Sequence, residues 1–304
     1  MTRIAIAATT WGSIGVFVRL VDAHPAVIVF WRVAFAGITI AIVAAYRDQL
    51  RALVRLPARK RLALAGMGAL LALNWVLFMG ALQLVDIAVA VLLAYCGPVF
   101  VAALTPLVMR ERFDRRVIVP LLLALGGTAV IVSPSDISFA DGTAALGATM
   151  AFGSAVTYAL LILNAKRLLR GIPATVYMLG EYTAAGILLL PAVLLLDGPS
   201  MPMEWAALLA LGVLNTALTG LLFLSGLRTV RADHAAILTY AEPVSAVAFA
   251  AAFLGESLTA ATVAGGAAVL LGGLMVTRLR PSAAVEGPPV LMEADAESPE
   301  REHS

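Results

Sequence analysis

The sequence predicts an all-α integral membrane protein with ten transmembrane helices arranged as two inverted five-helix repeats. Three observations predict this fold class. The 304 residues are 61% hydrophobic and only 13% charged, whereas a soluble domain is about half apolar and about a quarter charged. Basic residues gather in alternate loops, and the second half of the chain repeats features of the first half.

Ten apolar stretches are long enough to be membrane spans, because a helix of roughly 20 residues crosses the hydrocarbon of a bilayer. The first begins just after Arg3 and is longer than the apolar region of a signal peptide, so it is interpreted as a short transmembrane helix. The predicted spans are residues 4–20, 25–46, 62–82, 86–109, 116–132, 142–164, 173–196, 204–226, 233–254 and 259–277.

Loop charges predict the orientation, because cytoplasmic loops carry an excess of Lys and Arg. If the N-terminus is cytoplasmic, all 21 basic residues except Arg19 and Arg32 fall in cytoplasmic loops or tails. The opposite loops carry mainly acids. A multi-pass protein of the plasma or inner membrane with both termini in the cytoplasm is therefore expected. The segregated charge gives no indication of a nucleic-acid partner, although the net charge is +2.

The two halves match when the sequence is shifted by 145 residues, which places Tyr95 on Tyr240 and Pro98 on Pro243. Other pairs in this register include Glu111 with Glu256, Leu82 with Leu227 and Val85 with Val230; Arg19 matches Lys166 at a shift of 147. Each repeat has five helices, an odd number, so the second is inverted relative to the first. Residues 1–132 and 142–278 are the predicted repeats, and the acidic segment 279–304 is predicted to be disordered. Inverted repeats are typical of secondary transporters.

Several motifs resemble the EamA family of the drug/metabolite transporter superfamily. They are Trp11-Gly12-Ser13, Arg32, Tyr95-Cys96-Gly97-Pro98 followed by Glu111, and Tyr240-Ala241-Glu242-Pro243 followed by Gly255-Glu256. The first copy has Arg110 where glycine is common in the family, a minor departure. The resemblance covers about residues 1–278 and implies ten helices in two repeats. It also implies transport of amino acids, nucleotide-related metabolites or drugs, without fixing a substrate.

Glu242 is the strongest candidate for a binding residue. It falls about ten residues into the ninth span, near the middle of the membrane, where an ionisable side chain is costly. The neighbouring Pro243 has no N–H, so the carbonyl of Thr239 is expected to lose its helical partner. Glu242 could bind a substrate amine or a proton, or it could be a buried glutamate that holds helices together.

Two further ionisable residues, Arg32 and Glu181, fall at comparable depths in the two repeats. Arg32 could bind a substrate carboxylate through two parallel hydrogen bonds. Each residue could instead belong to a structural ion pair.

Uncharged candidates could line the same cavity as aromatic walls with a few polar groups. They are Trp11, Asn74, Phe78, Tyr95, Tyr158, Tyr182, Asn215, Thr219 and Tyr240. Hydrogen bonding between helices is the alternative role of the polar members. The glycine pairs of the fifth and tenth spans, Gly126-Gly127, Gly265-Gly266 and Gly272-Gly273, permit close helix packing inside the fold or in a homodimer.

The function expected from these residues is secondary active transport of a small molecule, an amino acid or related metabolite, by export. No phosphate-binding loop, His-Glu-x-x-His motif or Gly-x-Ser-x-Gly motif occurs. No cofactor, metal site or enzymatic activity is therefore predicted. The alternative is a non-transport membrane protein, either an intramembrane enzyme or a partner subunit.

Overall fold

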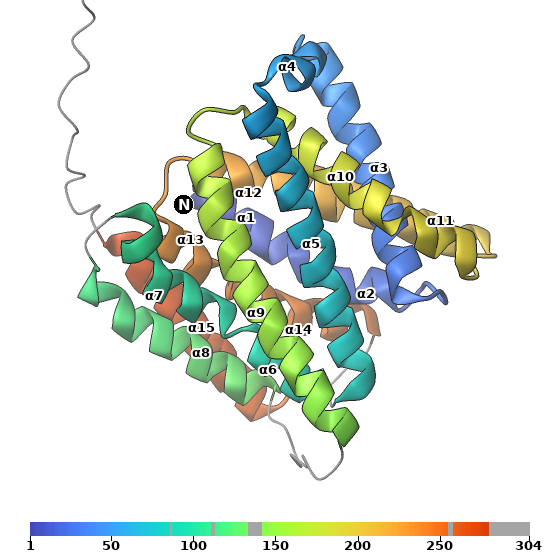
Figure 1. The fold of residues 1–304 in the computed structure, drawn as a ribbon. Coiled ribbons are helices and arrows are strands. Elements are labelled where there is room, and N and C mark those ends of the chain that lie inside the picture. Colours follow the sequence, from blue (N-terminus) through green and yellow to red (C-terminus); the bar gives the residue numbers. More distant parts are fainter. Residues whose placement is uncertain (86, 111–112, 133–141, 255–257, 280–304) are drawn as a thin grey trace, which may run out of the picture.

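The computed structural model describes residues 1–85, 87–110, 113–132, 142–254 and 258–279 (Figure 1). In these ranges every regular element is a helix, as predicted. The ten spans correspond in order to α1 (Thr2–Trp11) with α2 (Ile14–Val18), α3 (Pro25–Tyr46), α5 (Ala58–Leu84), α6 (Ile87–Ala94) with α7 (Gly97–Met109), α8 (Ile118–Val132), α9 (Gly142–Leu168), α10 (Ala174–Leu195), α11 (Pro202–Ala210) with the π-helix η2 (Leu211–Leu218) and α12 (Thr219–Leu227), α13 (Ala232–Leu238) with α14 (Ala241–Leu254), and α15 (Ala260–Arg278).

Two short elements were not predicted: helix α4 (Leu50–Arg55) in a loop, and the 3₁₀ turn η1 (Arg115–Val117), which covers the start of the predicted span 116–132. The third span also begins earlier than residue 62. Helix α5 starts at Ala58 because Pro57 holds an extended backbone just before it. The predicted roles of Glu111, Glu256 and the tail from residue 280 lie outside the described residues.

The outer surfaces of these helices suit a lipid environment. Eight of the described segments are long and apolar enough to cross a membrane, and Thr2–Val18 is a shorter apolar segment. Large apolar side chains point away from the protein, as with Leu107 at 76% and Ile187 at 66% exposure. In water this arrangement would be unfavourable, whereas in a bilayer it places hydrocarbon against hydrocarbon.

Four of the spans are interrupted, at glycines, at prolines or by a π-helix. The first span divides at Gly12 and Ser13, where α14 approaches so closely that a Cβ at Gly12 would lie 2.2 Å from Ser245 Oγ. The fourth and ninth spans divide before Gly97-Pro98 and before Pro243. The eighth contains the π-helix η2.

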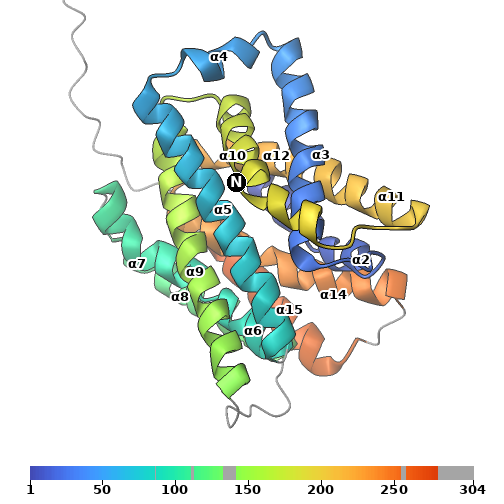
Figure 2. The ribbon, with the colours of Figure 1, turned by 45° about the vertical axis from the view of Figure 1, so that its right-hand side comes forward.

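The two halves interlock rather than lying side by side as separate units. Helix α10 of the second half packs against α3 and α5 of the first, and α9 packs against α5 and α7. Helix α1 in turn packs against α12 and α14. Figures 1 and 2 show α5 and α9 running beside each other on one side of the molecule. The space between this pair and the helices α1, η2 and α14 is where the candidate site lies.

Helices α8 and α15 form a close pair through their glycines. A Cβ at Gly127 would lie 2.5 Å from the carbonyl oxygen of Gly265, and one at Gly272 would lie 2.6 Å from that of Pro120. Backbone atoms at such distances leave no room for a side chain. These glycines therefore permit close helix packing inside the fold of one chain. Of the two roles that the sequence left open, packing inside the fold and packing in a homodimer, the structure supports the first for them.

Candidate functional site

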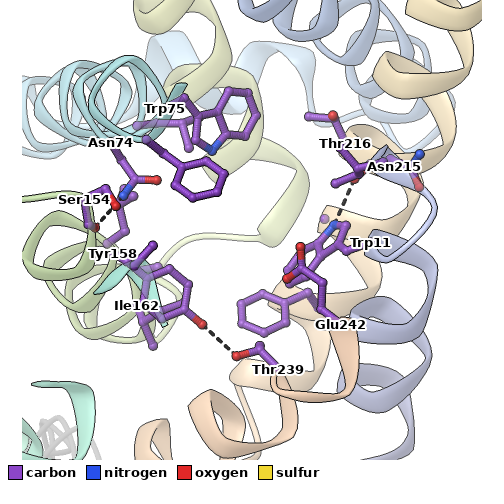
Figure 3. A pocket seen from close by; sticks show the side chains of 18 of the residues that line it. Trp11, Asn74, Trp75, Ser154, Tyr158, Ile162, Asn215, Thr216, Thr239 and Glu242 are labelled. Carbon is purple, nitrogen blue, oxygen red and sulfur yellow. Dashed lines mark hydrogen bonds between the residues drawn. The ribbon is translucent and has the colours of Figure 1, made fainter. Parts of the chain in front are cut away.

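A cavity with a volume of about 310 Å³ lies between the two halves, within the size range of small-molecule sites. Its wall combines aromatic side chains with a few polar and charged groups, contributed by both repeats. Figure 3 shows Asn74, Trp75 and Tyr158 on one side and Trp11, Glu242 and Asn215 on the other. A solute in this space would therefore touch elements of both halves at once.

Ten of the twelve residues predicted for the site line this cavity, and two do not. Those that line it are Trp11, Arg32, Asn74, Phe78, Tyr95, Tyr158, Glu181, Tyr182, Asn215 and Glu242. Tyr240 and Thr219 are not part of the lining.

The two interrupted helices meet at the middle of the protein. The break between α6 and α7 falls at Tyr95 and Cys96, and the break between α13 and α14 falls at Thr239 and Tyr240. The rings of Tyr95 and Tyr240 lie 5.8 Å apart. Tyr240 is fully buried, and its hydroxyl donates a hydrogen bond of 2.6 Å to the carbonyl oxygen of Tyr95. The prediction that Tyr240 lines the cavity is wrong because the free carbonyl at the opposite break holds its hydroxyl.

Glu242 lies in the first turn of α14, where the helix dipole favours a negative charge. Its side chain borders the same cavity as those of Tyr95 and Arg32. The expectation that the Thr239 carbonyl lacks a partner is wrong, because the backbone N–H of Glu242 donates to it at 3.0 Å. The tight turn before Pro243 thus aims Glu242 at the cavity while satisfying the backbone.

The position in the first repeat that corresponds to Glu242 is Gly97. A Cβ at Gly97 would lie 2.7 Å from Cδ1 of Tyr158, so the Tyr158 ring occupies the space that a side chain would need. Tyr158 in turn shares a hydrogen bond of 3.1 Å with the Thr239 hydroxyl. The carboxylate on this wall therefore comes from one half only.

Arg32 is 8% exposed and is held from two directions. Its Nε donates to Thr216 Oγ1 at 2.6 Å, and its guanidinium carbon lies 4.2 Å from the centroid of the Trp75 ring. Such a cation–π contact is worth about 2 kcal/mol when desolvated. The hydrogen bond and the ring fix the plane of the guanidinium, and Arg32 borders the cavity.

The π-helix explains why Thr216 lines the cavity and Thr219 does not. In η2 the hydrogen bonds span five residues instead of four, which turns successive side chains onto a different face. The Thr219 hydroxyl donates back to Leu214 O at 2.7 Å. Carbonyls of the same segment serve as acceptors: Trp11 Nε1 donates to that of Asn215 at 2.9 Å, and the Tyr182 hydroxyl donates to that of Thr216 at 3.2 Å.

Glu181 on α10 borders the cavity but already has a partner. Its Oε1 accepts a hydrogen bond of 2.9 Å from the Tyr177 hydroxyl. Asn74 is likewise engaged, since its Nδ2 donates to Ser154 O at 2.7 Å and to Thr157 Oγ1 at 2.9 Å. Asn74 therefore joins α5 to α9 in addition to lining the cavity, whereas the bond of Glu181 stays within α10.

Sequence reasoning missed Trp75, Tyr177 and Thr216, all of which line the cavity. Helical spacing could have found two of them. Tyr177 lies four residues before Glu181, and Trp75 lies three residues before Phe78, so each shares a face with a predicted residue. Within the described ranges, no three His, Cys, Asp or Glu side chains gather as a metal site would require.

The model of the EamA-like transporter family matches residues 2–133 and again residues 145–278. The chain belongs to the EamA-like transporter family. An uncharacterized transporter of Archaeoglobus fulgidus is 30% identical over 279 residues, which cover 90% of this chain and 95% of the relative.

Two further similarities agree with this membership. The uncharacterized transporter YwfM of Bacillus subtilis is 28% identical over 204 residues, covering 66% of this chain and 68% of the relative. A solved crystal structure superimposes with a TM-score of 0.79 at 20% identity, over 90% of this chain and 96% of the other. At that identity the superposition supports the fold alone. This EamA-like chain is thus a multi-pass membrane transporter with a cavity between its two halves.

Proposed function

We propose that this transporter exports amino acids or related small metabolites across the plasma or inner membrane by alternating access. One observation carries the proposal: Glu242 and Arg32 border a single aromatic-walled cavity between the inverted halves. A carboxylate suits a substrate amine, and a guanidinium suits a substrate carboxylate. The cytoplasmic placement of both termini remains the orientation that the loop charges favour.

Glu242 is proposed to have a second role as the proton site. A carboxylate that alternates between a proton and a substrate amine couples the two, because protonation removes the negative charge that attracts the amine. The arrangement of the wall supports this role, since Glu242 shares the cavity with the Tyr95 side chain and with Arg32, whose Nε is bonded to Thr216 Oγ1.

The experiment is a thermal-stability measurement of the purified protein with three matched ligands: an aromatic amino acid, its decarboxylated amine and its deaminated acid. A ligand at about 100 times its dissociation constant stabilises the folded state by about 2.7 kcal/mol. We expect the amino acid to raise the melting temperature most. Glu242→Gln should abolish the advantage over the deaminated acid, and Arg32→Gln should abolish the advantage over the amine.

Transport in proteoliposomes with an imposed pH gradient completes the test. Wild-type protein should move the stabilising ligand faster when protons run down their gradient in the opposite direction. Glu242→Gln should remove this acceleration. A Glu242→Gln protein with normal transport and an unchanged pH dependence would contradict the proton role, and a flat response to all three ligands would contradict the amino-acid assignment.

A further inference from the structure

Lys166 near the end of α9 makes a cap on the end of a neighbouring helix. Its ammonium group, in a residue only 8% exposed, donates hydrogen bonds to the carbonyl oxygens of Leu227, at 2.8 Å, and of Val230. Leu227 is the last residue of α12, so its carbonyl lacks a helical N–H beyond it, and Val230 lies in the loop between α12 and α13. One side chain therefore joins α9 to α12 through charge-assisted hydrogen bonds.

This cap lies directly beside the cavity. Ala165, the residue before Lys166, lines the cavity, as does Leu224, one turn before Leu227. The neighbouring Arg167 donates to the carbonyl oxygen of Val108 near the end of α7. At this end of the cavity α9 is thus tied to helices of both repeats.

The internal repeat gives each partner in this cap a counterpart at the opposite face. In the 145-residue register Leu227 corresponds to Leu82 and Val230 to Val85, and Arg19 corresponds to Lys166 at a shift of 147. Leu82 and Val85 lie at the end of α5, as Leu227 and Val230 lie at the end of α12. Arg19 follows α2. The first repeat therefore has a cation and a helix end at sequence positions that correspond to those of the cap.

In this structure these counterparts have other neighbours. The end of α5 packs against the start of α9, where a Cβ at Gly147 would lie 2.9 Å from Leu84 Cβ. Arg19 lines a shallow pocket together with Asp22 and Glu204, at the start of α11. The cap is thus formed by the second repeat, while the corresponding elements of the first repeat face different parts of the protein.

We propose that Lys166 is a gating residue that holds one face of the transporter closed, and that Arg19 closes the other face in the alternate state by capping the carbonyls of Leu82 and Val85. The proposal rests on the proposed alternating access. It names the two contacts, one at Lys166 and one at Arg19, of which each forms in one of the two states. Two inverted halves can exchange conformations, so a contact made by one half in one state is made by its counterpart in the other. Arg suits the role because its five N–H donors can reach two carbonyls.

The test measures access to the cavity from each face and needs no substrate. Cys96 is replaced by serine, and a reporter cysteine is placed at Leu161 or Met79, which line the cavity on α9 and α5. A membrane-impermeant thiol reagent is added to proteoliposomes from the Lys166 face for Leu161→Cys and from the Arg19 face for Met79→Cys. Each reporter is compared with itself after Lys166→Met, Lys166→Arg or Arg19→Met is added.

Lys166→Met should raise the labelling rate of Leu161→Cys and lower that of Met79→Cys. The ratio of the two rates should change by about tenfold or more, since two charge-assisted hydrogen bonds are lost in one state only. Arg19→Met should change the ratio in the opposite direction, and Lys166→Arg should keep it near the wild-type value. Loss of a nearby cation makes a thiol less reactive, so it would oppose the rise expected at Leu161→Cys.

Reciprocal changes in the two rates separate a gate from a general weakening of the fold, which would raise both. Rates that rise together, or a ratio that stays constant in a Lys166→Met protein with an unaltered melting temperature, would overturn the proposal. If Lys166→Met fails to fold, Arg19→Met provides the test by itself. A ratio of the two labelling rates that stays at the wild-type value in Arg19→Met would then overturn the proposal. Failure of the ligand panel would refute the substrate assignment and leave these labelling results interpretable.

Discussion

Each glycine pair between α8 and α15 contains one crowded and one open position, which makes a matched mutational test. A Cβ at Gly127 would lie 2.5 Å from the Gly265 carbonyl oxygen, whereas nothing lies within 4 Å of one at Gly126. Ordinary contact begins at 3.4 Å, so Gly127→Ala requires the helices to separate locally by about 0.9 Å (3.4 minus 2.5). Overpacking of this kind typically costs about 1–3 kcal/mol.

The neighbouring substitution controls for helix propensity. Alanine is favoured over glycine within a helix by about 1 kcal/mol, and this gain applies equally at both positions. Gly126→Ala should therefore leave stability unchanged or raise it, while Gly127→Ala should lower it. The difference between the two variants isolates the clash. The same contrast is expected between Gly265 and Gly266, where the open position has its nearest neighbour at 3.6 Å.

Thermal unfolding in detergent, followed by tryptophan fluorescence, measures this difference. Gly127→Ala should melt several degrees below Gly126→Ala, because each kcal/mol corresponds to about 2–4 °C in a protein of this size. Equal melting temperatures would refute the close pairing of α8 and α15. If Gly126→Ala changed the oligomeric state and Gly127→Ala did not, the glycines would pack at an interface between chains.

Two other contacts give direct predictions. Tyr240→Phe removes the donor to the Tyr95 carbonyl and should destabilise the protein by about 1–3 kcal/mol, the usual effect of leaving a buried acceptor unpaired; a melting temperature equal to wild type would contradict the bond at the two helix breaks. Glu204→Ala removes the carboxylate that accepts the Asp22 backbone N–H at 2.8 Å and caps α11. The loss of a cap costs about 1 kcal/mol of stability, so proteolysis within residues 19–24 should become faster. An unchanged rate would refute the idea that Glu204 holds this segment in place.

The spans were predictable because hydrophobic length alone determines which segments can cross a bilayer. The interruptions were only partly predictable. Pro243 marks the break before α14 in the sequence, but the break at Gly12 depends on how closely Ser245 approaches, which is a tertiary contact. A sequence read as one continuous span, residues 4–20, therefore forms two short helices.

The candidate site shows the same division. Depth in the membrane identified Glu242 and Arg32, since the cost of a charge in hydrocarbon depends on position along the span. The direction of the Tyr240 side chain depends on the Tyr95 carbonyl in the other repeat, which accepts its hydrogen bond. That Thr216 lines the cavity, where Thr219 was predicted to, depends on the π-helical hydrogen bonds of η2. Neither feature has a local sequence signature that helical spacing alone would reveal.

The Tyr158 ring that fills the space beside Gly97 bears on why both repeats belong to one polypeptide. A transporter assembled from two identical five-helix subunits would carry the acid of position 242 twice or not at all. Here the covalent union of two diverged copies lets a bulky ring stand where symmetry would demand a second carboxylate. Two acids facing each other across a narrow space would repel, and one would take up a proton. Divergence within a single chain thus permits an unequal distribution of charge between two halves that match the same family model.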